Sequence, residues 1–343
     1  MSTESRHILL TGGAGYLGAV LTPKLLERGH RVTCLDCLLF GEGPLASVRD
    51  HAGFTLLQGD IRDHDMVTRT LREGDFDQII HLAAISNDPS SELDHELTRD
   101  VNLKAVEHIM TAAREHGVRR FIYASSASVY GIKEVDDVHE DLPLDPITIY
   151  ARCKAEGETI LNGLINDDFC GVSVRAATVC GYSPRLRLDL TINILTSHAI
   201  LNRAIRVFGG SQMRPNIHIE DLTDFYVELV EADRDLINGE AFNISHSNAT
   251  VMGLAEMIRD AIDPEIEINV VPTDDLRSYH LSADKVARVL GYQPKRALVE
   301  AVNDLRDAFA EGRIPAPDAA HYRNVVLMKE NPEFWTHQTP PQA

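Results

Sequence analysis

Two residues capable of acid–base chemistry stand four positions apart in the segment YARCK: Tyr150 and Lys154. Positions i and i+4 share one face of a helix, so the two side chains would lie together if this segment is helical. A free tyrosine, with a pKa of about 10, is a poor base at neutral pH. A neighbouring ammonium group favours the phenolate and lowers that pKa toward the operating range. The pair predicts a tyrosine base, although an exposed helical pair would show the same spacing.

A serine-rich stretch lies upstream of this pair. The segment YASSASVYG at residues 123–131 leaves an apolar run that predicts a strand. Ligands of open α/β sheets bind at the carboxyl ends of the strands, which is where this stretch would begin. The hydroxyl of Ser126 could then hydrogen-bond the substrate oxygen whose proton Tyr150 takes.

A glycine-rich loop stands near the amino terminus, in the segment TGGAGYLG at residues 11–18. Gly12, Gly15 and Gly18 follow a predicted strand and open a predicted helix. The first glycine permits the tight turn, the second lets the backbone approach a pyrophosphate, and the third lets the helix pack on the strand. The helix N-terminus adds amide donors and partial positive charge for the phosphates. The loop therefore predicts a dinucleotide site.

An acidic residue, Asp36, ends the next predicted strand, about 20 residues beyond the loop. A carboxylate there would hydrogen-bond the adenosine ribose hydroxyls and repel a 2′-phosphate, and no Lys or Arg follows it directly. NAD is therefore the expected cofactor, in preference to NADP. Its oxidised nicotinamide would also favour a Tyr150 phenolate. The alternative is a glycine cluster at an ordinary helix turn with a solvated aspartate.

A parallel sheet is needed to bring these residues together, and the amino-terminal half of the chain predicts one. Short apolar runs alternate with longer amphipathic stretches. Strands are predicted at His7–Thr11, Arg31–Asp36, Phe54–Gln58, Gln78–Leu82, Arg120–Ser125 and Val172–Arg175. Helices are predicted at Gly15–Arg28, Asp63–Leu71, Leu93–His116 and Ile149–Leu164. The fold class is therefore α/β, a Rossmann-type doubly wound parallel sheet with helices on both faces.

Beyond Gly181 the pattern is looser and predicts a smaller C-terminal α/β lobe at the carboxyl edge of the sheet. Its expected elements are helices at 190–201, 221–231 and 252–262 and strands at 205–208 and 241–244. The resulting organisation is an NAD-binding domain at 1–181, with elements returning to it from about 216–245, and a mainly substrate-binding lobe at 182–314. Residues 315–343, rich in proline and polar side chains, are expected to form a surface tail.

The composition is typical of a soluble globular protein: 343 residues, 44% hydrophobic and 25% charged. The 33 Lys and Arg against 52 Asp and Glu give a net charge of −19, which argues against a nucleic-acid partner but allows a local pocket for a small anion. No stretch suits a membrane span or a signal peptide, so the cytoplasm is the expected location. The five cysteines predict neither a disulfide framework nor a metal site, because Cys34 and Cys37 lack a second ligand pair.

The glycine loop, the serine stretch and the tyrosine–lysine pair, in this order, resemble the extended short-chain dehydrogenase/reductases that act on nucleotide sugars. The resemblance runs from Gly12 to about Gly291. It implies a catalytic set of Ser126, Tyr150 and Lys154, of which the last two also contact the cofactor. The other cofactor-binding residues that it implies are Gly12, Gly15, Tyr16, Leu17, Asp36, Asp60, Ile61, Leu82, Ala83, Ala84 and Asn102. It also implies a homodimer built on two long helices, near 93–116 and 149–164.

On the substrate side the resemblance is partial. The residues that it implies there, besides Ser126, are Thr178, Asn193, Arg214 and Arg277. Arg214 would bind a pyrophosphate, the anion site that such a substrate requires. Arg277 is displaced from the position that galactose epimerases use. Arg185 and Arg187 are either further ligands or solvated turn residues, and His218 is expected to be a packed structural histidine.

The residues after Ser126 bear on the reaction. Dehydratases and decarboxylases of this kind carry an acid there, because eliminating water needs an extra acid and base, whereas this chain has Ala127 and Ser128. The stretch instead resembles that of 4-epimerases, in which Tyr150 would take the sugar 4-hydroxyl proton while hydride passes to NAD, and hydride would return after the 4-keto sugar has turned. The alternatives are an NAD(P)-dependent 4-keto-sugar reductase or dehydrogenase and a non-catalytic NAD binder. Thr178 replaces the asparagine of galactose epimerases, which leaves the sugar open.

Overall fold

The computed structural model describes residues 4–133, 135, 137–273 and 280–332. Its largest element is a sheet of seven strands in which every neighbouring pair is parallel, in the order β10-β6-β5-β4-β1-β2-β3. The strands are β1 (His7–Thr11), β2 (Arg31–Asp36), β3 (Phe54–Gln58), β4 (Gln78–His81), β5 (Arg120–Ala124), β6 (Cys170–Ala176) and β10 (Glu240–Ile244). The strand order reverses between β1 and β4, the kind of switch point at which such sheets bind ligands. The predicted fold class is confirmed.

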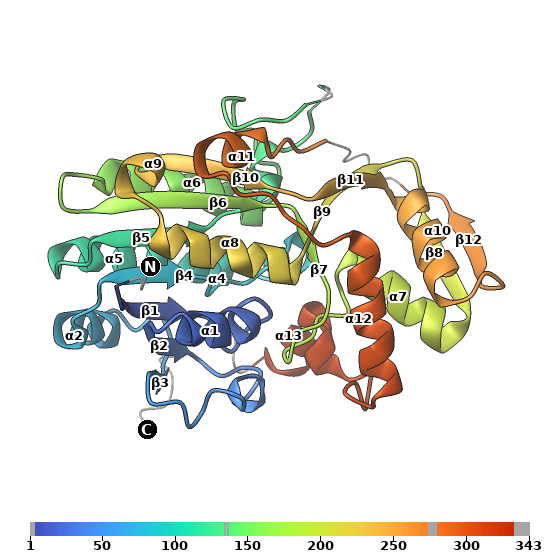
Figure 1. The fold of residues 1–343 in the computed structure, drawn as a ribbon, viewed down its shortest axis with the longest axis horizontal. Helices are drawn as coiled ribbons and strands as arrows, with labels where there is room; N and C mark the ends of the chain where they lie inside the picture. The colour runs from blue at the N-terminus through green and yellow to red at the C-terminus, as the bar shows by residue number, and fades with distance from the viewer. Residues whose placement is uncertain (1–3, 134, 136, 274–279, 333–343) are drawn as a thin grey trace.

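Helices cover both faces of this sheet (Figure 1). The helices of one face are α1 (Gly18–Glu27), α8 (Ile219–Glu231) and α11 (Asp284–Leu290), and those of the other are α2 (His64–Gly74), α5 (Ala105–Glu115) and α6 (Ile149–Leu164). Short helical segments in the connections are η1 (Gly43–Leu45), η3 (Ala127–Tyr130) and α9 (Arg234–Ile237). The sheet thus separates two apolar cores, with Leu25 and Phe225 in the first and Ile109 and Leu161 in the second.

Two of the predicted helices differ from the expectation. The first begins at Gly18, because residues 15–17 complete the glycine loop. The helix expected over Leu93–His116 contains a π-helical turn (Asp100–Lys104) between α4 (His95–Arg99) and α5, and a separate short helix, α3 (Asp88–Ser91), precedes it. In that turn the Asn102 side chain accepts a hydrogen bond from Ile85 N (2.8 Å) and donates one to Ile85 O (2.9 Å). The turn therefore ties the segment after β4 to the helix.

The smaller lobe lies beyond the carboxyl end of β6 (Figure 1). Its elements are β7 (Thr178–Cys180), α7 (Thr191–Asn202), β8 (Ala204–Phe208), β9 (Met213–His218), β11 (Ser247–Thr250), α10 (Val251–Ile262), β12 (Glu267–Val271) and α12 (Leu298–Ala310). β7, β9 and β11 form one sheet, and β8 and β12 form a parallel pair. The sequence predicted neither the first sheet nor β12, because these strands are short and do not alternate cleanly between apolar and polar residues. Helix α12 was also missed, although its buried Leu298, Val302 and Leu305 follow a helical spacing.

The expectation of a surface tail from residue 315 onward is wrong for the described part, which ends at residue 332. This segment forms η4 (Ala320–Tyr322) and α13 (Asn324–Glu330). Leu188 N donates to Tyr322 O (2.8 Å), and the Tyr322 and Met328 side chains are buried. Pro315 and Pro317 lie in the short connection between α12 and η4. None of the helices in the described ranges combines the length and apolar character that a bilayer crossing needs.

Gly18 and Gly163, both in helices, are predicted to respond oppositely to substitution by alanine. A Cβ at Gly18 would lie 2.4 Å from Gly13 Cα and 2.5 Å from Gly12 O, whereas one at Gly163 would meet nothing within 4 Å. We expect Gly18→Ala to lower the free energy of unfolding by about 1–3 kcal/mol. Gly163→Ala should raise it by about 0.5–1 kcal/mol, since it only improves helix propensity. Urea unfolding measures both, and an unchanged stability in Gly18→Ala would contradict the close packing of the loop.

Candidate active site

The glycine loop is packed between the strands on either side of β1. Gly12 has a left-handed backbone (φ 75°), and its amide donates to Leu35 O of β2 (2.9 Å). A Cβ at Gly12 would lie 2.7 Å from the amide nitrogen of Ala83, beyond β4. Only glycine fits between these two backbones. Residues 15–17 continue the loop to the first amides of α1, so the whole forms a cradle suited to a diphosphate.

Asp36 holds this loop from the end of β2. Its carboxylate accepts hydrogen bonds from Ala14 N (2.9 Å) and Leu38 N (2.8 Å). Burial raises the pKa of this carboxyl, while the two amides and the charge of Arg185 lower it. Each oxygen keeps a lone pair that a ribose hydroxyl could use, so the expected role of Asp36 stays a prediction. Its bond to Ala14, 22 residues away, was not expected from the sequence.

The other residues expected at the cofactor lie along the same edge of the sheet. Asp60 follows β3 and accepts a charge-assisted bond from Arg62 Nη2 (2.6 Å). Leu82 follows β4, and its amide donates to Thr11 O of β1 (3.0 Å). The remaining members, which stand in or against the same segments, are Ile61, Ala83, Ala84 and Asn102. The structure brings this set together, and its contacts with a cofactor stay predictions.

Ser126, Tyr150 and Lys154 meet where β5 and α6 approach each other. The Ser126 hydroxyl oxygen accepts hydrogen bonds from Ser128 N (3.2 Å) and Ser128 Oγ (3.0 Å). The Ser126 side chain also lies close enough to the Tyr150 hydroxyl to lower the pKa of that group. Lys154 Nζ donates to Ala124 O (2.7 Å) and lies 5.7 Å from the centre of the Tyr150 ring. The three side chains are therefore neighbours, as the helical spacing and the strand end predicted.

The surroundings shift the pKa values of Tyr150 and Lys154 in opposite directions. Burial, with the negative charge of Asp88, raises the pKa of Tyr150 to about 12. The positive charge of Arg187 and the nearby Ser126 side chain lower it. Burial lowers the pKa of Lys154 to about 8. The expectation that the lysine brings the tyrosine pKa down is not met by the protein alone, because desolvation of the phenolate is the larger effect.

A buried ionic network supports this site from behind. Glu158, one turn beyond Lys154 on α6, accepts hydrogen bonds from Arg175 Nε (3.0 Å) and Nη2 (2.7 Å) and from the Ser125 hydroxyl. These bonds join α6 to β5 and β6. Because Ser125 precedes Ser126, the network fixes the serine relative to the helix that carries Lys154.

Asp88 is a charged neighbour of Tyr150 that the sequence did not assign to the site. It stands in α3 and accepts a hydrogen bond from Thr148 Oγ1 (2.7 Å). Thr148 in turn caps α6, the helix that carries Tyr150 and Lys154. No motif or periodic pattern in the sequence marks residues 87–89, Asn-Asp-Pro, as part of the site.

Arg185 and Arg187 are buried, with 4% and 7% of their surface exposed. The Arg185 guanidinium stacks on the Phe40 ring, 3.6 Å from its centre. Arg187 donates from Nε to Asp189 Oδ1 (2.8 Å) and from Nη1 to Ser86 Oγ (3.2 Å). The alternative of solvated turn arginines is therefore wrong. No periodic pattern marks this segment, and Ser86 stands 101 residues from Arg187, so the sequence could not show the burial.

The residues expected on the substrate side are brought together only in part. Thr178 opens β7 and pairs with Asn216 of β9. Arg214 lies on β9 as well, where its Nη1 donates to Met213 O (3.2 Å). Arg277 lies outside the described residues. Thr178 and Arg214 thus belong to the same small sheet, and their contacts with a substrate stay predictions.

Asn193 is fully buried near the start of α7, and its side chain is used within the protein. Oδ1 accepts a hydrogen bond from Gly181 N (3.0 Å). Nδ2 lies within hydrogen-bonding distance of Arg187 O (2.9 Å) and Tyr16 Oη (3.2 Å). This amide holds the loop after β7, and neither of its donors is left over for a substrate diphosphate.

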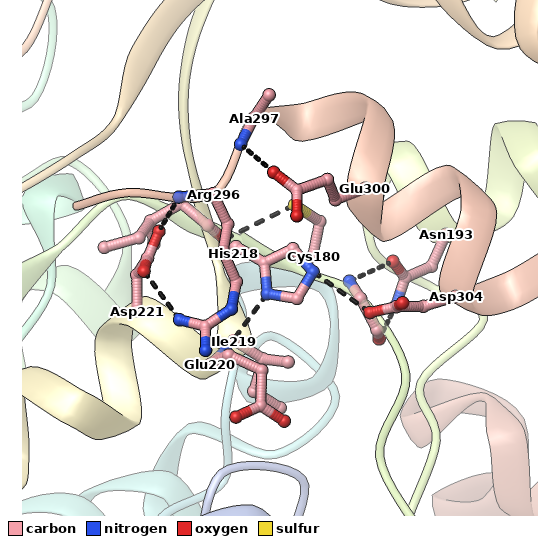
Figure 2. A network of polar contacts seen from close by, with 12 residues as sticks. Cys180, Asn193, His218, Ile219, Glu220, Asp221, Arg296, Ala297, Glu300 and Asp304 are labelled. Atoms are coloured by element: carbon pink, nitrogen blue, oxygen red, sulfur yellow. Dashed lines mark hydrogen bonds and ion pairs between the residues drawn. The ribbon is translucent and has the colours of Figure 1, made fainter.

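Figure 2 shows the polar contacts that join α12 to the start of α8. His218 Nδ1 accepts a hydrogen bond from Glu220 N (3.2 Å), and its Nε2 lies 3.2 Å from Asp304 Oδ2 of α12. Arg296, just before α12, donates from Nη1 to Asp221 Oδ1 (2.8 Å). His218 is therefore a packed structural residue that caps α8, as predicted.

Lys154 is predicted to give the protein a specific pH dependence of stability. Its pKa is lowered from 10.5 to about 8 in the folded protein. Below that pH the lysine is charged in both states and its burial lowers stability, whereas at high pH it is neutral in both and the penalty is gone. Relative to Lys154→Met, the free energy of unfolding of the native chain should therefore rise from about pH 8 to about pH 10. Urea unfolding at several pH values measures this difference, which would stay constant if the lysine were not desolvated.

A model of the NAD dependent epimerase/dehydratase family matches residues 8–245, more than half of the chain. The UDP-glucose 4-epimerase of Mycolicibacterium smegmatis is 32% identical over 303 residues, which cover 86% of this chain and 95% of that protein. The dTDP-glucose 4,6-dehydratase of Streptomyces griseus is 30% identical over 302 residues, which cover 84% of this chain and 89% of that protein. Relatives with different reactions are thus about equally similar.

The UDP-glucuronic acid 4-epimerase from Bacillus cereus, solved in complex with UDP-glucuronic acid and NAD, has the same fold. Its TM-score is 0.80, at 24% identity, over 89% of this chain and 99% of that chain. The cradle that a Cβ at Gly12 would fill, and the buried guanidinium groups beside it, fit an anionic dinucleotide. The chain belongs to the NAD-dependent epimerase/dehydratase family of enzymes.

Proposed function

We propose that this protein is a nucleotide-sugar epimerase that inverts C4 of a nucleoside-diphosphate hexose through a transient 4-keto sugar. The observation that carries the proposal is the grouping of Ser126, Tyr150 and Lys154 beside the dinucleotide cradle. The name of the Mycolicibacterium relative, UDP-glucose 4-epimerase, supports a UDP-hexose as substrate.

A homodimer through α5 and α6 belongs to the same proposal. Analytical ultracentrifugation would test it by measuring the mass of the protein in solution.

In this proposal Tyr150 moves the proton of the sugar 4-hydroxyl. Ser126, whose side chain lies close to the Tyr150 hydroxyl, holds the same sugar oxygen. Bound NAD supplies a hydride acceptor, and in the reverse direction a hydride donor, for C4. Because burial holds the Tyr150 pKa at about 12, the phenolate needs positive charge close by, which Lys154 and the oxidised nicotinamide ring provide.

Inversion at C4 requires the sugar to turn while the nucleotide stays bound. Arg214, on the small sheet of the second lobe, is proposed to hold the diphosphate. The binding energy of that remote group keeps the intermediate in place during the turn. Asn193 contributes by fixing the loop after β7, since its amide is already used there. Thr178 is proposed to contact the sugar.

The positions after Ser126 favour epimerisation over dehydration. Ala127 is buried, and Ser128 donates its hydroxyl hydrogen to Ser126. Neither side chain can transfer a proton to or from a sugar carbon at neutral pH, which the elimination of water requires. This difference outweighs the 30% identity to a dehydratase, because it concerns the reacting groups rather than the fold.

Tyr150→Phe is expected to abolish the interconversion of the preferred substrate among UDP-glucose, UDP-galactose and the uronic acids. Loss of the proton carrier should lower kcat by about 10²–10⁴-fold while NAD still binds. The matched control is Tyr123→Phe, because the Tyr123 hydroxyl is buried without a hydrogen-bond partner among the described residues. Chromatography of the nucleotide sugars gives the rates. Full activity in Tyr150→Phe would refute the assignment.

Turnover in deuterium oxide is expected to place no deuterium on carbon and to leave the total amount of reduced cofactor unchanged. Hydride that leaves C4 returns to C4, so no carbon exchanges with solvent. A dehydratase would exchange a carbon-bound hydrogen through its extra acid and base, and a reductase would consume reduced cofactor in proportion to product. Mass spectrometry of the sugar product and the absorbance of reduced NAD separate these three reactions, and either change would overturn the proposal.

A further inference from the structure

The segment after β7, residues 181–189, lies directly against the glycine loop. Tyr16 Oη donates to Gly181 O (2.8 Å), and Ser183 Oγ donates to Tyr16 O (2.8 Å). In each bond a side chain of one segment donates to a backbone carbonyl of the other. The segment is therefore held in place over the loop before any ligand arrives.

The two arginines of this segment contact the chain segments that follow β2 and β4. Arg185 stacks on Phe40, which follows β2. Arg187 donates to Ser86, which follows β4. In the sheet, β1 lies between β2 and β4, so the glycine loop at the end of β1 lies between the two contacts. The guanidinium groups thus bracket the place where the loop amides would receive phosphate.

Both guanidinium groups have N–H donors that no other described residue accepts. Among the described residues, Arg185 Nε and Nη1 and Arg187 Nη2 are buried and have no hydrogen-bond partner. Asp189 is the carboxylate paired with Arg187, and the negative charges of Asp189 and Asp36 both raise the pKa of Arg185. Unpaired donors on a buried cation are unfavourable unless an anion meets them. Burial and the positive charge of the nearby Arg187 lower the pKa of Arg185 to about 9, against the smaller effect of Asp189.

We propose that Arg185 and Arg187 bind the diphosphate of the dinucleotide from the side opposite the glycine-loop amides. The site is then a clamp with amide donors on one side and guanidinium donors on the other. A nucleotide sugar also carries a diphosphate, but Arg185 stacks on Phe40 and its charge acts on Asp36, while the charge of Arg187 acts on Tyr16. These neighbours belong to the glycine loop and to the end of β2, so the geometry points to the dinucleotide.

Asn324 is the positioning residue of this clamp. Its side-chain oxygen accepts a hydrogen bond from Arg185 Nη2. Its Nδ2 donates to Ser86 Oγ (3.2 Å), which also accepts a hydrogen bond from Arg187 Nη1. The backbone N–H of Asn324 donates to Asp189 Oδ2 (3.0 Å). Asn324, in the C-terminal segment, therefore contacts Arg185 directly and is linked to Arg187 through Ser86 and Asp189. That segment lies beyond residue 245, where the match to the family model ends.

The test is equilibrium binding of NAD and of UDP to the full-length protein, measured by calorimetry at two salt concentrations. The variants are Arg185→Gln and Arg187→Gln, with Arg206→Gln as a control that removes the same charge from an exposed position on β8. We expect each of the first two to weaken NAD binding by about 10- to 100-fold and to change UDP binding by less than about threefold. Their NAD affinity should also depend less on salt than that of the native chain.

Asn324→Leu should weaken NAD binding in the same direction, and Asn324→Gln should retain more of it, because the glutamine keeps an uncharged amide acceptor for Arg185. If a glutamine variant fails to fold, Arg185→Lys or Arg187→Lys replaces it in the binding measurement. Each lysine variant should bind NAD more weakly than the native chain does, and its NAD binding should still depend on salt.

Unchanged NAD affinity in both arginine variants would overturn the proposal. Loss of UDP binding with NAD binding intact would assign the clamp to the nucleotide sugar instead. An equal loss of both ligands would show that the arginines only support the loop. Because binding rather than turnover is measured, none of these outcomes depends on whether the enzyme is an epimerase.

Discussion

The site depends on the fit of the glycine loop between the carboxyl ends of β2 and β4. Gly12 leaves no room for a side chain against Ala83, and Asp36 fixes the loop through the Ala14 amide. This packing turns the first amides of α1 toward one edge of the sheet, where β5 delivers Ser126 and the neighbouring helix delivers Tyr150 and Lys154. Every other feature of the site is arranged around that edge, because parallel strands bring the ends of separate βαβ units together.

Burial controls the electrostatics of this edge more than the net charge of the chain does. The protein carries a formal charge of −19, yet cationic groups are buried at or behind the site, among them Lys154, Arg175, Arg185 and Arg187. Desolvation raises the pKa of Tyr150 and lowers that of Lys154, so both are moved away from their charged forms. A site of this kind binds anions locally while the rest of the surface stays acidic, and its charges respond strongly to whatever ligand enters.

The second lobe and the C-terminal segment both contribute contacts that hold the site together. α12 is joined to α8 through Asp304 and His218, which sets the lobe against the large sheet. Asn324 reaches the arginines after β7 and the serine after β4. The segment that was expected to be a surface tail is therefore packed, up to residue 332, because Tyr322 and Met328 bury their side chains there.

The sequence alone determined the parallel sheet, the glycine loop and the grouping of Ser126, Tyr150 and Lys154. Each of these is encoded over a short stretch, by apolar periodicity or by residues at a fixed spacing, so local geometry suffices. The tertiary structure alone decided that Arg185 and Arg187 are buried, that Asn193 is used inside the protein and that the charge of Asp88 acts on Tyr150. These facts depend on partners as far as 101 and 177 residues away, and on desolvation, which is a property of the packed protein and not of any one segment.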